Sequence, residues 1–321
     1  MNVKEEQLKF SLKQSLESIN GFDCIRFSHY ALPEMNFDEV DPSIVFLGKK
    51  FSSPIIIGSM TGGSEKTGKI NRKLAGVAEG KNIPFSTGSQ KIALKKKGFI
   101  KSFDVKKSSP GVFLISNIGG SALLEFGFDE IESSLNAVDA DALFVHLNPL
   151  QELIQSEGVK KWKGVGDKIK GLCDYLSVPV LVKEVGNGLN SRTALELQKL
   201  GVKGIDIAGF GGTNWSVIES KRLKTERNVF ENWGLTTLES LSECKNLRIP
   251  VIGSGGVRSG LDVAKVIRLG GSLASASLPF LKAVLENRLD EEIGKWVEEL
   301  KITMMLTRSK NLKELRRAKL L

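Results

Sequence analysis

Eight short apolar runs, each followed by a cluster of small or polar residues, predict that this chain folds as a closed (β/α)8 TIM barrel. Runs this short and this continuously apolar are typical of parallel strands covered on both faces, and most intervals between them can hold a helix. The runs occupy residues 54–57, 83–85, 112–115, 142–145, 178–182, 205–208, 249–252 and 273–275. Because the loops after the strands build the active site of such a barrel, we expect the functional residues in these eight clusters.

One domain accounts for the whole chain of 321 residues, although a barrel needs only about 250. We assign the barrel to residues 51–285. Residues 1–50 form an N-terminal extension, helical over 1–19 and irregular afterwards, where prolines interrupt any periodicity. Residues 286–321 form a C-terminal helical tail.

Three of the intervals between strands show apolar residues at 3- and 4-residue spacing, which predicts helices over 65–80, 191–200 and 262–269. The last two are followed by glycine, which helix C-termini favour. The segment 216–231 is longer and more charged than a minimal βα loop requires, and we interpret it as a flap over the site.

Charge and composition exclude several classes of protein. The net charge is +9, but the basic runs contain few aromatic residues, so they fit solvated faces that attract small anionic substrates rather than nucleic acid. The sequence contains neither the ~18 consecutive apolar residues of a membrane helix nor an apolar signal segment, so we expect a soluble, cytoplasmic protein. Cys24, Cys173 and Cys244 are odd in number and form no CxxC, which favours buried thiols over disulfides or a zinc site.

The cluster GSGGVRSG follows the seventh run and predicts a phosphate site. Glycines 253, 255 and 256 let the backbone approach an anion closely, and the N-terminus of the next helix adds positive potential. Barrels commonly bind phosphate at this point, beside the loop after strand eight. A Rossmann fingerprint is excluded, because the glycine spacing is wrong and the acidic residue expected about 20 positions later is missing.

Four more clusters, MTGG, STGSQ, SNIGG and GFGGT, place glycines and hydroxyls at other strand ends. Any one of them fits an ordinary tight turn. Together with the predicted phosphate site they favour a flat ligand lying against exposed backbone N–H groups, for which a flavin is the natural candidate.

Lys183 ends an almost wholly apolar strand and is expected to point into the barrel mouth. A buried ammonium needs a partner, so either Glu184 is its counter-ion or a ligand anion is. Neighbouring side chains on a strand face opposite ways, which favours the ligand. A lysine beside the N1/O2 edge of a reduced flavin would stabilise its negative charge.

The cluster HLNPLQE gathers His146, Asn148, Gln151 and Glu152 after the fourth run. His146 and Asn148 share strand parity and can donate to an anionic substrate. One carboxylate is too few for an all-protein cation site, but it suits Mg²⁺, which keeps several waters and shares phosphate oxygens. The other histidine, His29, does not lie in a comparable cluster of polar residues and is interpreted as structural.

From about residue 21 to residue 281 these motifs resemble the type 2 isopentenyl-diphosphate isomerases, which are FMN-dependent barrel enzymes. The matching strings include HYALPE, SMTGG, TGSQ, HLNPLQE, VKEVGNG, GFGGTNW, ENWG and GSGGVRSGLDVAKVIRLGG. The resemblance implies interconversion of isopentenyl and dimethylallyl diphosphates by 1,3-proton transfer on reduced FMN, assisted by Mg²⁺. It also implies NADPH as reductant of the flavin and a homo-oligomer, a tetramer or an octamer.

The same resemblance implies a role for individual residues. Those that would hold FMN are Met60, Thr61, Ser89, Asn117, Lys183, Thr213, Gly255, Gly256, Ala276 and Ser277. Those that would bind the substrate are Lys4, Gln90, His146, Asn148 and Gln151. Glu152 would bind Mg²⁺, and Gln151 and Lys183 would be catalytic. Side-chain acids are poorly matched to an alkene without an activating carbonyl, so a flavin N5 stacked on it would act as acid and base.

Two positions depart from the family pattern. The N-terminal Arg-Lys pair and a following His, which contact the diphosphate, correspond to VKEEQ, which keeps only Lys4. Val159 stands where relatives have an acidic residue after EG.

Other functions remain open at this point. An FMN oxidoreductase of the hydroxy-acid oxidase kind shares the glycine clusters but needs a histidine base on the late loops, and no histidine follows His146. A dehydrogenase acting on IMP needs a cysteine in the loop after strand six, where GFGGTNW has none. A non-catalytic basic binding protein would be colourless, whereas bound FMN makes a protein yellow.

Overall fold

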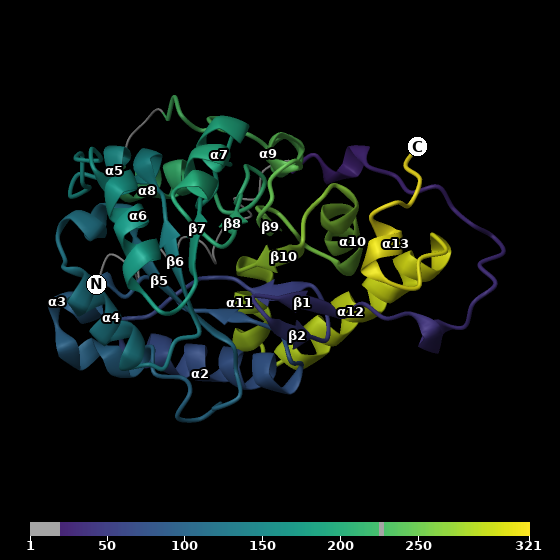
Figure 1. The fold of residues 1–321 in the computed structure, drawn as a ribbon, viewed down its shortest axis with the longest axis horizontal. Helices are drawn as coiled ribbons and strands as arrows, with labels where there is room; N and C mark the ends of the chain where they lie inside the picture. The colour runs from purple at the N-terminus through teal and green to yellow at the C-terminus, as the bar shows by residue number, and fades with distance from the viewer. Residues whose placement is uncertain (1–19, 225–227) are drawn as a thin grey trace.

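A closed barrel of eight parallel strands forms the centre of the computed structural model, which describes residues 20–224 and 228–321 (Figure 1). Each of the eight predicted runs overlaps one strand, so the predicted fold class is confirmed. Around the barrel the order is β10, β3, β4, β5, β6, β7, β8, β9. The strands are β3 Ile55–Ile57, β4 Phe85–Ser86, β5 Leu114–Gly119, β6 Ala142–His146, β7 Val180–Lys183, β8 Ile205–Asp206, β9 Val251–Ser254 and β10 Leu273–Ala276.

Helices follow the strands and cover the barrel from outside (Figure 1). The helix predicted over 65–80 has those bounds, and the other two predicted helices agree within two residues. Side-chain caps at Ser64, Asn190, Asn214, Thr236 and Ser259 begin five of the helices. The helices are α2 Glu65–Gly80, α3 Lys91–Lys95, α4 Phe128–Asn136, α5 Pro149–Ile154, α6 Val165–Tyr175, α7 Ser191–Lys199, α8 Trp215–Arg222, α9 Thr237–Cys244, α10 Gly260–Arg268, α11 Leu278–Leu285, α12 Leu289–Leu306 and α13 Leu312–Leu315.

The barrel interior has an apolar layer and a polar layer. The apolar layer lies toward the N-terminal ends of the strands, here the lower end, and the polar layer lies at their C-terminal ends, here the upper end or mouth. Side chains alternate along a strand, so residues two apart share a face. Phe144 and Leu181 belong to the apolar interior cluster, and His146 and Lys183, two residues later on the same strands, therefore point into the upper interior. The expected inward direction of Lys183 follows from this parity.

A two-stranded hairpin, β1 (Ile44–Phe46) and β2 (Lys49–Phe51), precedes the barrel and closes its lower end. Leu47 and Gly48 make the turn with positive φ angles of 49° and 81°, which suits a tight antiparallel hairpin. Phe46 and Phe51 join the interior cluster, and the Phe51 and Phe113 rings meet edge-on at 5.4 Å. The sequence pattern of residues 44–51 does not predict these two strands.

The C-terminal tail is part of the packed structure. Trp296 of α12 is 1% exposed and packs against Phe280 of α11, with 4.7 Å between ring centroids. The lead-in at 20–41 is irregular apart from two short 3₁₀ turns, as predicted, and it runs along the tail, where Ser28 N–H donates to the Lys319 carbonyl (Figure 1). The helix predicted over 1–19 lies outside the described residues.

The three cysteines do not share one environment. Cys244 is buried, Cys173 is half-buried and Cys24 is exposed, so the expectation of buried thiols is wrong for Cys24. No disulfide forms among them. Within residues 20–224 and 228–321, no helix has both the length and the apolar character needed to cross a bilayer.

Candidate functional site

The barrel mouth opens into a cavity of about 650 Å³, whose lining comes from the ends of all eight strands and the loops that follow them. All ten residues predicted to hold FMN lie in this lining, and so do four residues of the HLNPLQE cluster. These are Met60, Thr61, Ser89, Asn117, Lys183, Thr213, Gly255, Gly256, Ala276 and Ser277, together with His146, Asn148, Gln151 and Glu152. Lys4 lies outside the described residues.

Gln90 is the described site residue that the structure does not bring into the cavity lining. It immediately precedes α3 and is 3% exposed. Its Oε1 accepts a hydrogen bond from Ser134 Oγ of α4 at 3.0 Å, so the amide is turned toward the helix layer. The sequence could not show this turn, because Ser134 lies 44 residues away along the chain.

The corner after β9 and β10 offers backbone rather than side-chain groups. Gly255 and Gly256 have φ angles of 99° and 79°, a conformation that favours glycine. A Cβ on either residue would collide with a carbonyl oxygen of the loop after β8, at 2.0 and 2.4 Å. Beside them α11 begins after Ser277, and its first turn lines the cavity, so its positive N-terminus faces the same space.

Lys183 has Asp206, not Glu184, beside it in the barrel interior. The two residues are opposite each other in the β7–β8 register, and Asp206 is 2% exposed. Burial raises the pKa of Asp206, while Lys183 and the Ser254 hydroxyl stabilise its charged form. Asp206 is not among the predicted site residues, although a carboxylate directly after Ile205 on a barrel strand is a usable signal.

Glu184 has a structural role in the loop after β7. Its Oε2 accepts three backbone N–H groups, from Val185, Gly186 and Asn187, at 2.5–2.7 Å. Burial raises the pKa of Glu184 to about 7, although these donors and Lys183 stabilise the charged form. The Lys183 ammonium donates to the Glu184 backbone carbonyl, at 2.5 Å, and not to the Glu184 side chain. The expectation that these two side chains face opposite ways therefore holds.

The HLNPLQE cluster is held together by its own amides and carboxylate. Asn148 Nδ2 donates to Gln151 Oε1 at 3.0 Å and to Glu152 Oε1 at 3.3 Å. Glu152 Oε2 accepts the backbone N–H of Val159 at 2.7 Å. The backbone amide of Val159 therefore holds one oxygen of the Glu152 carboxylate in place.

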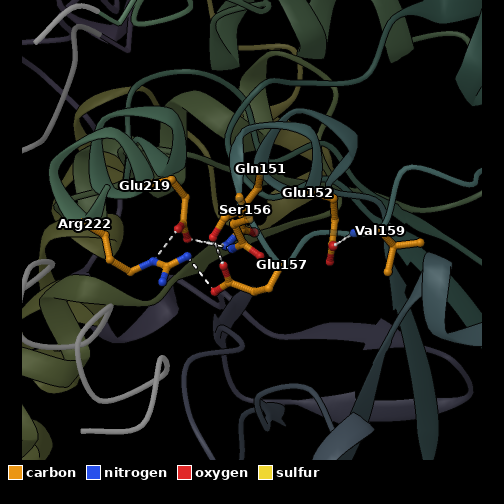
Figure 2. A network of polar contacts seen from close by, with 8 residues as sticks. Gln151, Glu152, Ser156, Glu157, Val159, Glu219 and Arg222 are labelled. Carbon is orange, nitrogen blue, oxygen red and sulfur yellow. Dashed lines mark hydrogen bonds and ion pairs between the residues drawn. The ribbon is translucent and has the colours of Figure 1, made fainter. Parts of the chain in front are cut away.

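Glu219 of α8 joins this loop to the loop after β8, and sequence analysis missed it (Figure 2). It is fully buried and accepts Gln151 Nε2 at 3.3 Å, Gln155 Nε2 at 2.7 Å and Arg222 Nε at 2.8 Å. Arg222 also pairs with Glu157 at 2.6 Å. Hydrogen bonds from Ser156 and Arg222 lower the pKa of Glu157 to about 2.

The described part of the segment interpreted as a flap is instead a wall of the site. Ser216, Ile218 and Glu219 of α8 are buried, and Trp215 lines the cavity. The apolar and capping contacts of α8 make it part of the folded barrel. Residues 225–227 lie outside the described part of the chain.

Comparison with known proteins gives two kinds of likeness. The model of the FMN-dependent dehydrogenase family matches residues 150–321. Isopentenyl-diphosphate delta-isomerases of Rickettsia prowazekii (strain Madrid E) and Rickettsia felis are 43% and 42% identical to this chain. Each match covers 99% of the chain and 96% or 95% of the relative.

Solved structures share the fold at low sequence identity. A putative lactate oxidase of Pediococcus acidilactici superposes with a TM-score of 0.69 at 14% identity, covering all of this chain and 87% of that one. A chimeric (S)-mandelate dehydrogenase gives 0.70 at 16% identity, covering 99% and 91%. Identity above 40% over nearly the full length shows the closer kinship, and the chain belongs to the FMN-dependent, type 2 family of isopentenyl-diphosphate delta-isomerases.

Proposed function

We propose that this protein interconverts isopentenyl diphosphate and dimethylallyl diphosphate by a 1,3-proton transfer on reduced FMN. The observation that carries the proposal is the meeting of two residue sets in one cavity. Gly255 and Gly256 follow β9 and Lys183 ends β7, whereas His146 ends β6 and Asn148, Gln151 and Glu152 follow it. One set suits a flavin, and the other suits an anionic substrate lying against it.

The residues present fit FMN. The backbone at Gly255 and Gly256 and the N-terminus of α11 suit a phosphate, and a cavity of about 650 Å³ is within the usual range for cofactor sites. When bound, FMN in its reduced form would supply a group that can give and take the proton of an unactivated alkene. Lys183 would hold the negative charge of the reduced ring, and Asp206 keeps the lysine at the interior face.

The residues after β6 would hold and orient the substrate. Asn148 is 5% exposed, and its Oδ1 has no hydrogen-bond partner among the described residues, so it can accept from a ligand. Gln151 is oriented at both ends of its amide, by Asn148 and by Glu219. Such a side chain loses little freedom when it positions an alkene for proton transfer.

Glu152 suits Mg²⁺ that also binds a diphosphate. Among the described residues no group of three His, Cys, Asp or Glu side chains could enclose a metal ion. Mg²⁺ nevertheless binds through one or two carboxylates when phosphate oxygens and water complete its shell. The Val159 and Asn148 contacts hold the Glu152 carboxylate in place at the cavity wall.

Three further parts of the proposal rest on the family resemblance. NADPH would reduce the flavin, the chain would assemble as a tetramer or octamer, and the protein would work in the cytoplasm on a small diphosphate. Reduction of bound FMN by NADPH under nitrogen, followed at the flavin absorption band, tests the first. Light scattering of the purified protein tests the second.

The alternative is an FMN-dependent barrel oxidoreductase acting on another anionic substrate, which the fold of the lactate and mandelate enzymes favours. The chain has no histidine after His146 to act as base on the late loops. Anaerobic assays with reduced FMN, Mg²⁺ and isopentenyl diphosphate should show the dimethylallyl product. Flavin reduction by a 2-hydroxy acid, with no isomerase turnover, would support the oxidoreductase and contradict the isomerase proposal.

A further inference from the structure

A chain of hydrogen bonds runs across the barrel interior and ends on His146. Ser86 Oγ of β4 lies 2.6 Å from Ser59 Oγ, which follows β3. Ser59 Oγ accepts Asn117 Nδ2 of β5 at 2.8 Å. Asn117 Oδ1 lies 2.7 Å from His146 Nδ1 of β6. Four neighbouring strands or their loops thus supply one continuous path to the imidazole.

The direction of these bonds decides where the ring proton lies. Asn117 has one donor group, Nδ2, and it is directed to Ser59. Its Oδ1 can only accept, so His146 Nδ1 must carry a hydrogen. Ser59 Oγ accepts from Asn117 and can itself donate a hydrogen bond to Ser86 Oγ. Ser86 Oγ in turn donates to the Thr87 carbonyl at 3.4 Å.

This arrangement suits a histidine that meets an anion. With Nδ1–H fixed toward Asn117, the Nε2 edge lies on the opposite side of the ring, next to Gly119. A Cβ on Gly119 would stand 3.2 Å from Nε2, so a larger residue at this position would press on that edge, and Gly119 and His146 both line the cavity. In the doubly protonated ring Nδ1 still donates to Asn117, and Nε2–H points away from it.

We infer that the Ser86–Ser59–Asn117 chain fixes the hydrogen of His146 on Nδ1 in the neutral ring and presents the Nε2 edge to the anionic group of the substrate, to which Nε2–H donates when the ring is doubly protonated. Asn117, Ser59 and Ser86 are positioning residues in this inference, because they act through His146. The identity of the anion as a diphosphate rests on the proposed function; the tautomer does not.

The ring nitrogens can be observed directly, because the chain contains only His29 and His146. Protein labelled with ¹⁵N at histidine, with FMN and without substrate, gives two imidazole patterns in long-range ¹H–¹⁵N spectra. His146→Gln removes one pattern and so assigns it. At a pH where the ring is neutral, we expect Nδ1 of His146 to carry the proton. A predominant Nε2–H tautomer would overturn the inference, whatever the outcome of an isomerase assay.

Two substitutions of similar size at Asn117 separate the tautomer from simple packing. Asn117→Asp keeps an acceptor opposite Nδ1 and is expected to retain the Nδ1–H tautomer. Asn117→Leu removes the acceptor, and a mixture of tautomers is expected. Equal tautomer populations in the two variants would contradict the role given to Asn117.

Ser86→Ala tests the far end of the chain, since Ser86 is fully buried and is not part of the cavity lining. It should shift the His146 tautomer population and weaken binding of inorganic pyrophosphate with Mg²⁺ by about 2- to 10-fold, the range for one lost hydrogen bond. Ser116→Ala is the matched control, because Ser116 on β5 is equally buried and its hydroxyl has no partner among the described residues. Equal effects of the two variants would show that the chain does not act on His146.

Discussion

The two ends of the barrel interior differ in chemistry although they are made from the same strands. At the lower end Phe46, Phe51 and Phe113 close the barrel with aromatic rings. At the upper end His146 and Lys183 point into the interior. Each lies two residues after an apolar interior residue of its strand, Phe144 on β6 and Leu181 on β7. Packing without polar atoms supports stability, and polar groups fixed by neighbours support chemistry. The barrel therefore separates the two requirements by height along each strand.

The largest expected effect lies at the lower end. Phe51 is 1% exposed, so Phe51→Ala should cost about 3–5 kcal/mol of unfolding free energy through the cavity that it leaves. The kcat of the remaining folded protein should stay unchanged, because the hairpin is far from the mouth. Urea unfolding and the isomerase assay measure the two quantities. A large fall in kcat of the folded fraction would contradict the conclusion that the lower end contributes to stability and not to catalysis.

Lys183→Ala makes the opposite test at the upper end. Removal of the cation should lower kcat by about 10²- to 10³-fold and weaken the binding of reduced FMN more than that of oxidised FMN. The reason is that only the reduced ring carries the negative charge that the ammonium would stabilise. Flavin titrations in both redox states measure the difference. Equal losses of affinity in the two states would remove Lys183 from the electrostatic role.

Glu184, although it lies near the mouth, is expected to affect the stability of the fold and its dependence on pH. Burial raises its pKa from 4.5 to about 7, so between these values the folded protein holds a proton that the unfolded chain has lost. This contribution to stability is complete below pH 4.5 and disappears as pH rises toward 7, with a slope of up to about 1.4 kcal/mol per pH unit. Glu184→Gln should flatten the curve of unfolding free energy against pH in that window. Parallel curves for the two proteins would mean that Glu184 is ionised in the fold.

Glu152→Gln sharpens the comparison within the mouth. If Glu152 is the protein carboxylate on Mg²⁺, its loss should raise the Mg²⁺ concentration for half-maximal activity by about 10-fold or more, since a metal ligand is removed. Flavin content should not change, because the FMN residues lie on other loops. An unaltered Mg²⁺ titration would contradict the assignment.

The smallest effect is expected for the ion pair between Arg222 and Glu157. The Glu157 side chain is 44% exposed, so a double-mutant cycle with Glu157→Gln and Arg222→Gln should give a coupling of about 0.5–1 kcal/mol in stability. Arg222→Gln alone should cost more, because it also removes the ion pair between Arg222 and the buried Glu219. Similar costs for both single substitutions would mean that Glu219 does not depend on Arg222.

The eight barrel strands, three helices and most of the cavity lining could be predicted from the sequence alone. Short continuous apolar runs are typical of covered strands, and the alternation of side chains along β7 places Lys183 inside the barrel. Glycine and hydroxyl clusters at strand ends predicted the residues that now share one cavity. These features depend on local periodicity, which a sequence records directly.

The partners of the polar groups, by contrast, depend on how the elements pack in three dimensions. Asp206 lies beside Lys183 because β7 and β8 pair, and Glu219 reaches Gln151 across 68 residues of chain. Gln90 turns away from the cavity because a hydroxyl of α4 is within reach. A hydrogen bond depends on distances set by barrel closure and helix packing. Such partners cannot be predicted from residue type and spacing alone.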